Sequence, residues 1–107
     1  MSSEVPKPRV KKIVLYACQF EISARAAREL FNQYLENEIN YLGIRGWAQE
    51  IEDGCIKGRL EGELSKIDKL KTVLRNSPQF GSKIITNVFG EMKQINKYTS
   101  EKFEIMC

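Results

Sequence analysis

Residues 42–62, LGIRGWAQEIEDGCIKGRLEG, contain the clearest structural signal in this chain of 107 residues. Two runs that read as strands meet there at Asp53-Gly54. An Asp-Gly pair between two such runs is a strong signal of a β-hairpin, because both residues accept the backbone conformation that a tight turn requires. The sequence therefore predicts two antiparallel strands joined by a turn at these residues.

Upstream of this hairpin the sequence predicts one strand followed by one helix. Residues 12–23, KIVLYACQFEIS, alternate apolar and polar side chains, which is typical of a strand with one buried face. Apolar residues then recur at helical spacing up to Gly43, which ends the helix. The residues expected in the core are Val14, Tyr16, Cys18, Phe20 and Ile22 of the strand, and Leu30, Phe31, Tyr34, Leu35, Ile39 and Leu42 of the helix.

Downstream of the hairpin we expect a second helix and two further strands. Ser65 opens the helix and forms an acidic variant of the capping box with Asp68. Residues 76–82 end the helix, since they contain Pro78 and Gly81, and residues 83–89 and 98–106 are predicted strands. The residues expected to anchor these elements in the core are Ile67, Leu70, Val73, Leu74, Tyr98 and Phe103.

The predicted order is strand, helix, strand, strand, helix, strand, with one more strand at the end. Two helices and a mostly antiparallel sheet form a two-layer α+β sandwich, and this order is that of the ferredoxin-like arrangement. We expect a five-stranded sheet with both helices on one face and solvent on the other.

The positive charge of the chain is concentrated at its start. Residues 1–12 hold four basic residues and one acidic residue, which leaves 13 basic and 13 acidic residues in the rest. Proteins that bind phosphate backbones carry their excess positive charge on the folded surface, so this distribution argues against nucleic acid as a partner. We expect residues 1–11 to form a flexible basic tail and residues 12–107 to form one domain.

The composition excludes several kinds of chemistry. The chain has no histidine, which excludes Ser–His, Cys–His and zinc–histidine sites. Its three cysteines are far apart, and an odd number without CxxC spacing favours reduced thiols in the cytosol or nucleus. No apolar run approaches the ~20 residues of a membrane span, and residues 1–12 lack the apolar segment of a secretory signal. We expect a cytoplasmic monomer without metal, cofactor or membrane contact. Entry into the nucleus remains an open alternative.

Residues 42–62 closely resemble the core signature of the acylphosphatase family. In that family a strand of the form Leu-Gly-x-x-Gly-Trp-Val-x-Asn leads into a hairpin and then into Gly-x-Val-x-Gly-x-Leu-x-Gly. The match extends without a gap over roughly residues 20–74, and more loosely to the end of the chain after a short deletion near Asn76. The resemblance implies that residues 12–107 form an acylphosphatase-like domain.

The resemblance also implies an enzyme that hydrolyses carboxyl-phosphate anhydrides without metal or cofactor. In the family, a glycine-rich turn after the first strand surrounds the phosphate with backbone N–H groups. An arginine at the start of the first helix supplies the cation, and an asparagine at the end of the next strand positions the attacking water. Oriented amides bind anions, and phosphoryl transfer depends mostly on positioning and charge stabilisation.

Every one of these family positions is substituted in this chain. The two loop glycines fall on Ala24 and Arg28, the catalytic arginine falls on Asn32, and the water-positioning asparagine falls on Glu50. Only Arg25 keeps its family type. The phosphate loop as a whole corresponds to Ala24, Arg25, Ala26, Ala27, Arg28, Glu29 and Leu30.

These substitutions predict a catalytically degenerate protein, a pseudoenzyme. Asparagine cannot offer phosphate a charged fork, and a carboxylate at Glu50 repels a dianion. Residues other than glycine cannot freely adopt positive φ at Ala24 and Arg28. Because residues 24–30 are good helix formers, we expect the first helix to start early, near Ala26, or side chains to close the loop.

Two other functions remain open. One is an active acylphosphatase with a remodelled site, in which Arg25 or Arg28 supplies the cation and a small acyl phosphate or another anion is bound weakly. The other is a ferredoxin-like binding module for an unknown protein partner or nucleic acid. RNA recognition on such a sheet uses exposed aromatic residues, whereas the strand with Lys57 and Arg59 carries none and we expect Trp47 in the core.

Overall fold

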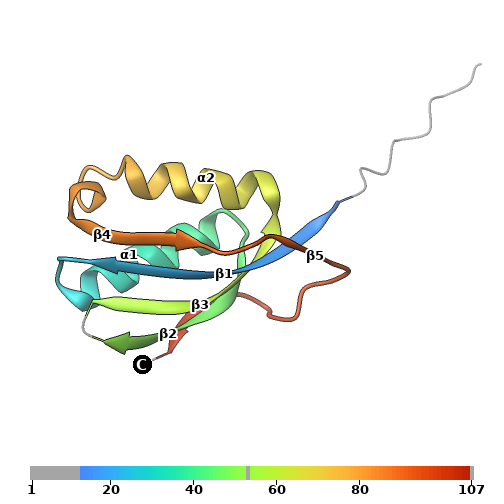
Figure 1. Ribbon diagram of the computed structural model, residues 1–107, viewed down its shortest axis with the longest axis horizontal. Coiled ribbons are helices and arrows are strands. Elements are labelled where there is room, and N and C mark those ends of the chain that lie inside the picture. The colour runs from blue at the N-terminus through green and yellow to red at the C-terminus, as the bar shows by residue number, and fades with distance from the viewer. Residues whose placement is uncertain (1–12, 53, 107) are drawn as a thin grey trace, which may run out of the picture.

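The computed structural model describes residues 13–52 and 54–106. The predicted tail of residues 1–11, Lys12 at the predicted start of the domain, Asp53 of the predicted turn and Cys107 lie outside the described residues. None of the helices in the described ranges is long and apolar enough to cross a membrane. In chain order (Figure 1) the elements are β1 (Leu15–Ala24), α1 (Arg28–Tyr41), β2 (Arg45–Glu52), β3 (Cys55–Glu63), α2 (Leu64–Arg75), a 3-10 turn (Gly81–Lys83), β4 (Ile84–Phe89), β5 (Lys93–Ile95) and β6 (Phe103–Met106).

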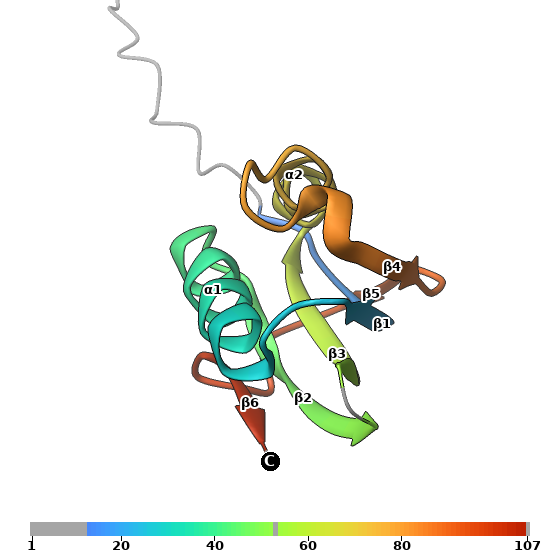
Figure 2. The same ribbon diagram turned by 90° about the vertical axis from the view of Figure 1, so that its left-hand side faces the viewer.

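The sheet has the strand order β4-β1-β3-β2-β6. Its neighbouring strands are antiparallel except β2 and β6, which are parallel. Both helices lie on the same side of the sheet (Figure 2), which confirms the ferredoxin-like α+β sandwich. The expected number of strands is too low by one, because β5 pairs with the first residues of β1 on the edge that β4 also uses.

The core lies between the two helices and the inner face of the sheet. Alternate residues of β1 point inward as predicted, and both helices contribute one apolar face. Burying such a side chain contributes roughly 1.5–3 kcal/mol each, so this interior supplies most of the free energy that favours folding. Its members include Cys18, Phe20, Ile22, Phe31, Leu35, Ile39, Ile56, Leu60, Ile67, Leu70, Leu74 and Phe103.

Two residues predicted in the core are exposed. The exposed fraction is 56% for Leu30 and 41% for Trp47. Leu30 belongs to the first turn of α1 and precedes Phe31, where the buried face of that helix starts. Trp47 precedes Ala48, which is fully buried on the inner face of β2, and successive strand residues point to opposite faces. Trp47 therefore projects from the open face of the sheet.

The predicted C-terminal end of α1 is confirmed, whereas the predicted N-terminal cap of α2 is wrong. Gly43 has φ 76°, and the N–H of Ile44 donates to the carbonyl of Ile39 at 3.1 Å, so α1 ends at the predicted glycine. The predicted cap at Ser65 is wrong, because α2 begins at Leu64 and has no side-chain cap. The strand β3 runs directly into this helix, which leaves no separate capping residue.

The last strand is shorter than predicted because a buried carboxylate binds the segment before it. Glu61 of β3 is fully buried and accepts the N–H groups of Thr99 at 2.9 Å and Ser100 at 3.2 Å. It also accepts the hydroxyl of Thr99 and the Nε–H of Arg59, the latter at 3.0 Å. The backbone at residues 99–100 is thus bound to a side chain instead of a neighbouring strand, and β6 begins only at Phe103.

These hydrogen bonds set the ionisation of Glu61. Burial by itself would raise the pKa of the carboxyl, but the hydrogen bonds from Thr99, Arg59 and Ser100 stabilise the charged form and lower the pKa below its ordinary value. A carboxylate whose pKa is lowered by folding stabilises the folded state at pH values above its pKa in the unfolded chain. This contribution is lost as the pH falls through its pKa in the folded protein.

Glu61→Gln should therefore destabilise the protein by about 1–3 kcal/mol at pH 7, because several donors lose a charged acceptor. The difference from the wild type should stay constant down to about pH 4.3, the ordinary pKa of glutamate, and shrink below it. Urea denaturation at a series of pH values measures both effects.

The matched control is Glu101→Gln, an exposed residue that follows the same bound segment, which should leave the stability unchanged within ~0.5 kcal/mol. A stability difference for Glu61→Gln that grew below the ordinary glutamate range would contradict the lowered pKa.

Candidate functional site

The predicted site residues lie at one end of the sheet, where the β1–α1 connection meets the β2–β3 hairpin (Figure 1). Antiparallel pairing along β1 and β3 joins Ser23 to Cys55, so the end of β1 lies beside the turn. The N–H of Ala24 donates to the carbonyl of Gly54 at 3.0 Å, which attaches the loop to the hairpin.

A hollow of about 760 Å³ opens at this end of the molecule. The sequence comparison with the family placed the phosphate loop at residues 24–30, and all seven of these residues line the hollow together with Gly54. Asn32 does not line it. It lies one turn further along α1, on the same helical face as Arg28.

The loop backbone lacks the left-handed residues that commonly form a phosphate cradle. Such a cradle uses successive N–H groups that converge, commonly with left-handed residues, and no residue in the range 24–30 has positive φ. The N–H of Ala24 is bound to Gly54, and that of Arg25 donates to the carbonyl of Lys83 at 2.8 Å. At least two amides of the loop therefore stabilise the fold itself.

The first helix starts at Arg28, with Ala27 as its N-cap residue. The prediction of a start near Ala26 is wrong by two residues. The helix nevertheless includes both Arg28 and Asn32, the residues that the resemblance assigns to a loop glycine and to the catalytic arginine. Ala27 carries no side-chain oxygen and makes no capping hydrogen bond, which leaves the first turn of α1 facing the hollow without a side-chain cap.

Two substituted positions contact each other directly. The Nη1 of Arg28 lies 2.8 Å from the Oε2 of Glu50, a charge-assisted hydrogen bond between the start of α1 and the end of β2. The side chain of Glu50 is only 10% exposed, whereas that of Arg28 is 51% exposed. Glu50 therefore holds a nearby cation of the same chain.

From the sequence, the substitutions at Arg28 and Glu50 are identified separately, and the ion pair between them is not predicted. A signal was present, because the two replacements have opposite charge and the family fold brings the loop and the end of that strand together. Arg25 lines the hollow and is exposed. Among residues 13–52 and 54–106, no group of three or more acidic or cysteine side chains is arranged to hold a metal ion.

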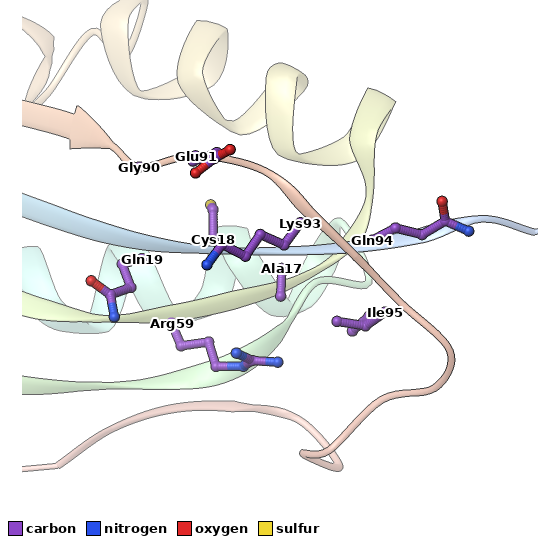
Figure 3. Close-up of a pocket in the computed structure, with 9 residues that line it drawn as sticks. All are labelled: Ala17, Cys18, Gln19, Arg59, Gly90, Glu91, Lys93, Gln94 and Ile95. Atoms are coloured by element: carbon purple, nitrogen blue, oxygen red, sulfur yellow. The ribbon is translucent and has the colours of Figure 1, made fainter.

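Another hollow, of about 510 Å³, lies away from this end of the sheet, between β1 and the segment that joins β4 to β5 (Figure 3). Its lining includes Gln19, Arg59, Glu91 and Lys93. It contains none of the positions that correspond to the phosphate loop.

The comparison with protein families identifies an acylphosphatase domain over residues 18–105. Acylphosphatase-1 of Drosophila melanogaster is 28% identical over 91 residues, which cover 85% of this chain and 76% of the relative. Acylphosphatase-2 of Homo sapiens is 26% identical over 91 residues, which cover 85% of this chain and 92% of the relative.

Solved structures agree in fold. An acylphosphatase from Coxiella burnetii superposes with a TM-score of 0.65 at 16% identity and covers 87% of this chain and 94% of its own. A BLUF protein, BlrB, reaches the same TM-score of 0.65 at 16% identity and covers 87% of this chain and 72% of its own. These likenesses show a shared ferredoxin-like fold, and the family match over residues 18–105 shows that the chain belongs to the acylphosphatase family.

Proposed function

We propose that this protein is a catalytically degenerate acylphosphatase, which does not hydrolyse acyl phosphates at a useful rate. The observation that supports this most directly is the ion pair between Arg28 and Glu50. Its carboxylate belongs to Glu50, the residue that the resemblance assigns to the position of the water-binding asparagine. The cation at a former glycine position binds that carboxylate.

The loop backbone supports the same proposal. Residues 24–30 contain no positive φ, and the N–H groups of Ala24 and Arg25 are bound to carbonyl groups of the chain. A phosphate entering the hollow would have to compete with these hydrogen bonds and with the negative charge of Glu50. Positioning of the reacting groups contributes up to ~7–11 kcal/mol to catalysis, so the loss of the cradle removes a large share of the rate enhancement.

The replacement of the catalytic arginine adds to this loss. Asn32 is neutral and lies within α1. An arginine that stabilises a phosphoryl-transfer transition state contributes a factor on the order of 10³–10⁵ in rate, equivalent to about 4–7 kcal/mol. In the alternative of an active, remodelled site, Arg25 or Arg28 would supply the cation, and both residues line the hollow.

We further propose that the protein is a cytoplasmic monomer that binds a small acyl phosphate or another anion at most weakly. The composition of the chain supports this location, because its three cysteines are few, separated and odd in number.

The purified protein should hydrolyse an aryl acyl phosphate such as benzoyl phosphate no faster than the spontaneous reaction, because the cradle, the cation and the water-binding residue are all replaced. An assay beside an acylphosphatase with an intact glycine-rich loop measures the difference. Robust turnover that Arg25→Ala or Arg28→Ala abolishes would contradict the proposal and would support a remodelled active site.

Restoring the two side chains alone should not restore activity. The double variant Asn32→Arg with Glu50→Asn should stay nearly inactive, because its loop still cannot hold the phosphate. Adding Ala24→Gly and Arg28→Gly should give turnover that neither pair of substitutions gives alone. The two glycines are expected to lower the stability by about 0.5–1 kcal/mol each, so thermal unfolding must confirm that the quadruple variant is folded.

The variant with only Ala24→Gly and Arg28→Gly is the matched control, since it has the reopened loop without the arginine. Full activity of the double variant Asn32→Arg with Glu50→Asn would show that the existing loop still binds phosphate.

A further inference from the structure

The open face of the sheet carries an aromatic side chain that the core does not use. Trp47 is 41% exposed and is the only tryptophan of the chain. Exposing so large an apolar side chain forgoes a considerable part of its burial energy. Exposed aromatic residues on the open face of a ferredoxin-like sheet are the usual means by which such sheets bind bases.

A hollow of about 560 Å³ lies beside Trp47. This volume falls within the range of roughly 300–1,000 Å³ that is typical of small-molecule sites. Three adjacent strands line it through side chains of the open face, and their register places Trp47 opposite Arg59 and Gln49 opposite Lys57. Gln19 pairs with Arg59 on the other side.

Figure 3 shows two of these side chains, because Gln19 and Arg59 also border the hollow drawn there. Both project to one side of β1 and β3, whereas Cys18 projects to the other. The residues around Trp47 therefore form one surface that is separate from the helix-covered core and from residues 24–30.

The groups on this surface suit a planar, anionic ligand with hydrogen-bonding edges. Trp47 offers an aromatic face for stacking. The amides of Gln19 and Gln49 each offer a donor and an acceptor, the pattern that recognises the edge of a purine. The side chain of Lys57 is 58% exposed, and its ammonium group pairs with a carboxylate oxygen of Glu21 at 3.8 Å. Such an exposed pair contributes only ~0–1 kcal/mol, so an incoming phosphate can compete with Glu21 for this cation.

We propose that the open sheet face binds a single purine nucleotide, with its base stacked on Trp47 and its phosphate near Lys57. One exposed aromatic ring stacks one base. A nucleic-acid strand would require a positive track along the surface, but residues 13–107 carry equal numbers of basic and acidic residues. The surface therefore fits a mononucleotide better than a strand.

Because Trp47 is the only tryptophan, its fluorescence reports directly on this surface. Titration with adenosine 5′-monophosphate should quench the fluorescence in a saturable manner, since the base stacks on the indole. Ribose 5-phosphate, which has the phosphate without the base, should not quench it. A single-stranded oligoadenylate should bind no more tightly per nucleotide than the monophosphate.

Two variants separate stacking from charge. Lys57→Ala keeps the fluorescent reporter and should weaken binding about 2- to 5-fold, as expected for one exposed charge pair, whereas Lys66→Ala on α2 should leave it unchanged. Trp47→Leu removes the ring and should weaken binding about 5- to 100-fold when measured by calorimetry, the range expected for one stacked base. Thermal unfolding shows whether each variant is folded.

The absence of saturable quenching at millimolar adenosine 5′-monophosphate would overturn the proposal. Equal quenching by ribose 5-phosphate would show that no base is stacked, and equal weakening by Lys57→Ala and Lys66→Ala would show a general charge effect. An oligoadenylate that bound more than tenfold tighter per nucleotide would replace the mononucleotide with a nucleic-acid strand.

Discussion

The antiparallel pairing of β1 with β3 determines where everything else in this molecule lies. It extends from Leu15 opposite Glu63 to Ser23 opposite Cys55 without interruption. Since Cys55 at the start of β3 also pairs with Glu52 at the end of β2, the end of β1 must lie close to the end of β2. This topology brings Glu50 within 2.8 Å of Arg28 although they are far apart in sequence.

The stability of the fold does not depend on the side chains at the positions that the resemblance assigns to catalysis. The buried side chains lie between the sheet and the helices, whereas the family positions lie in a loop and at the ends of elements. The ion pair of half-exposed Arg28 with Glu50 joins the start of α1 to the end of β2 and is not part of this core. Ala24 and Arg28, the positions that the resemblance assigns to family glycines, favour a regular strand end and helix start more than glycine would. These residues therefore stabilise the local structure.

Much of this arrangement could be predicted from the sequence, because the hairpin turn, Gly43 and the period-two pattern of β1 depend on local rules. The errors arose where tertiary contacts decide. Glu61 binds residues 99–100 and shortens β6, which no local pattern reveals. The outward position of Trp47 follows from its alternation with the small residue Ala48, yet its aromatic character suggested burial. To predict the ion pair between Arg28 and Glu50, the sheet topology must be known as well as the residue types.

The proposed loss of phosphate binding at residues 24–30 can be measured most directly at their amides. Backbone amide resonances of the ¹⁵N-labelled protein would be followed while inorganic phosphate is added, with an acylphosphatase that has an intact glycine-rich loop as the reference. Because no loop residue has positive φ and at least two N–H groups are bound to carbonyl groups, we expect no saturable shift of these amides at millimolar phosphate. Saturable shifts confined to consecutive amides of residues 24–30 would show that the cradle persists and would contradict this account.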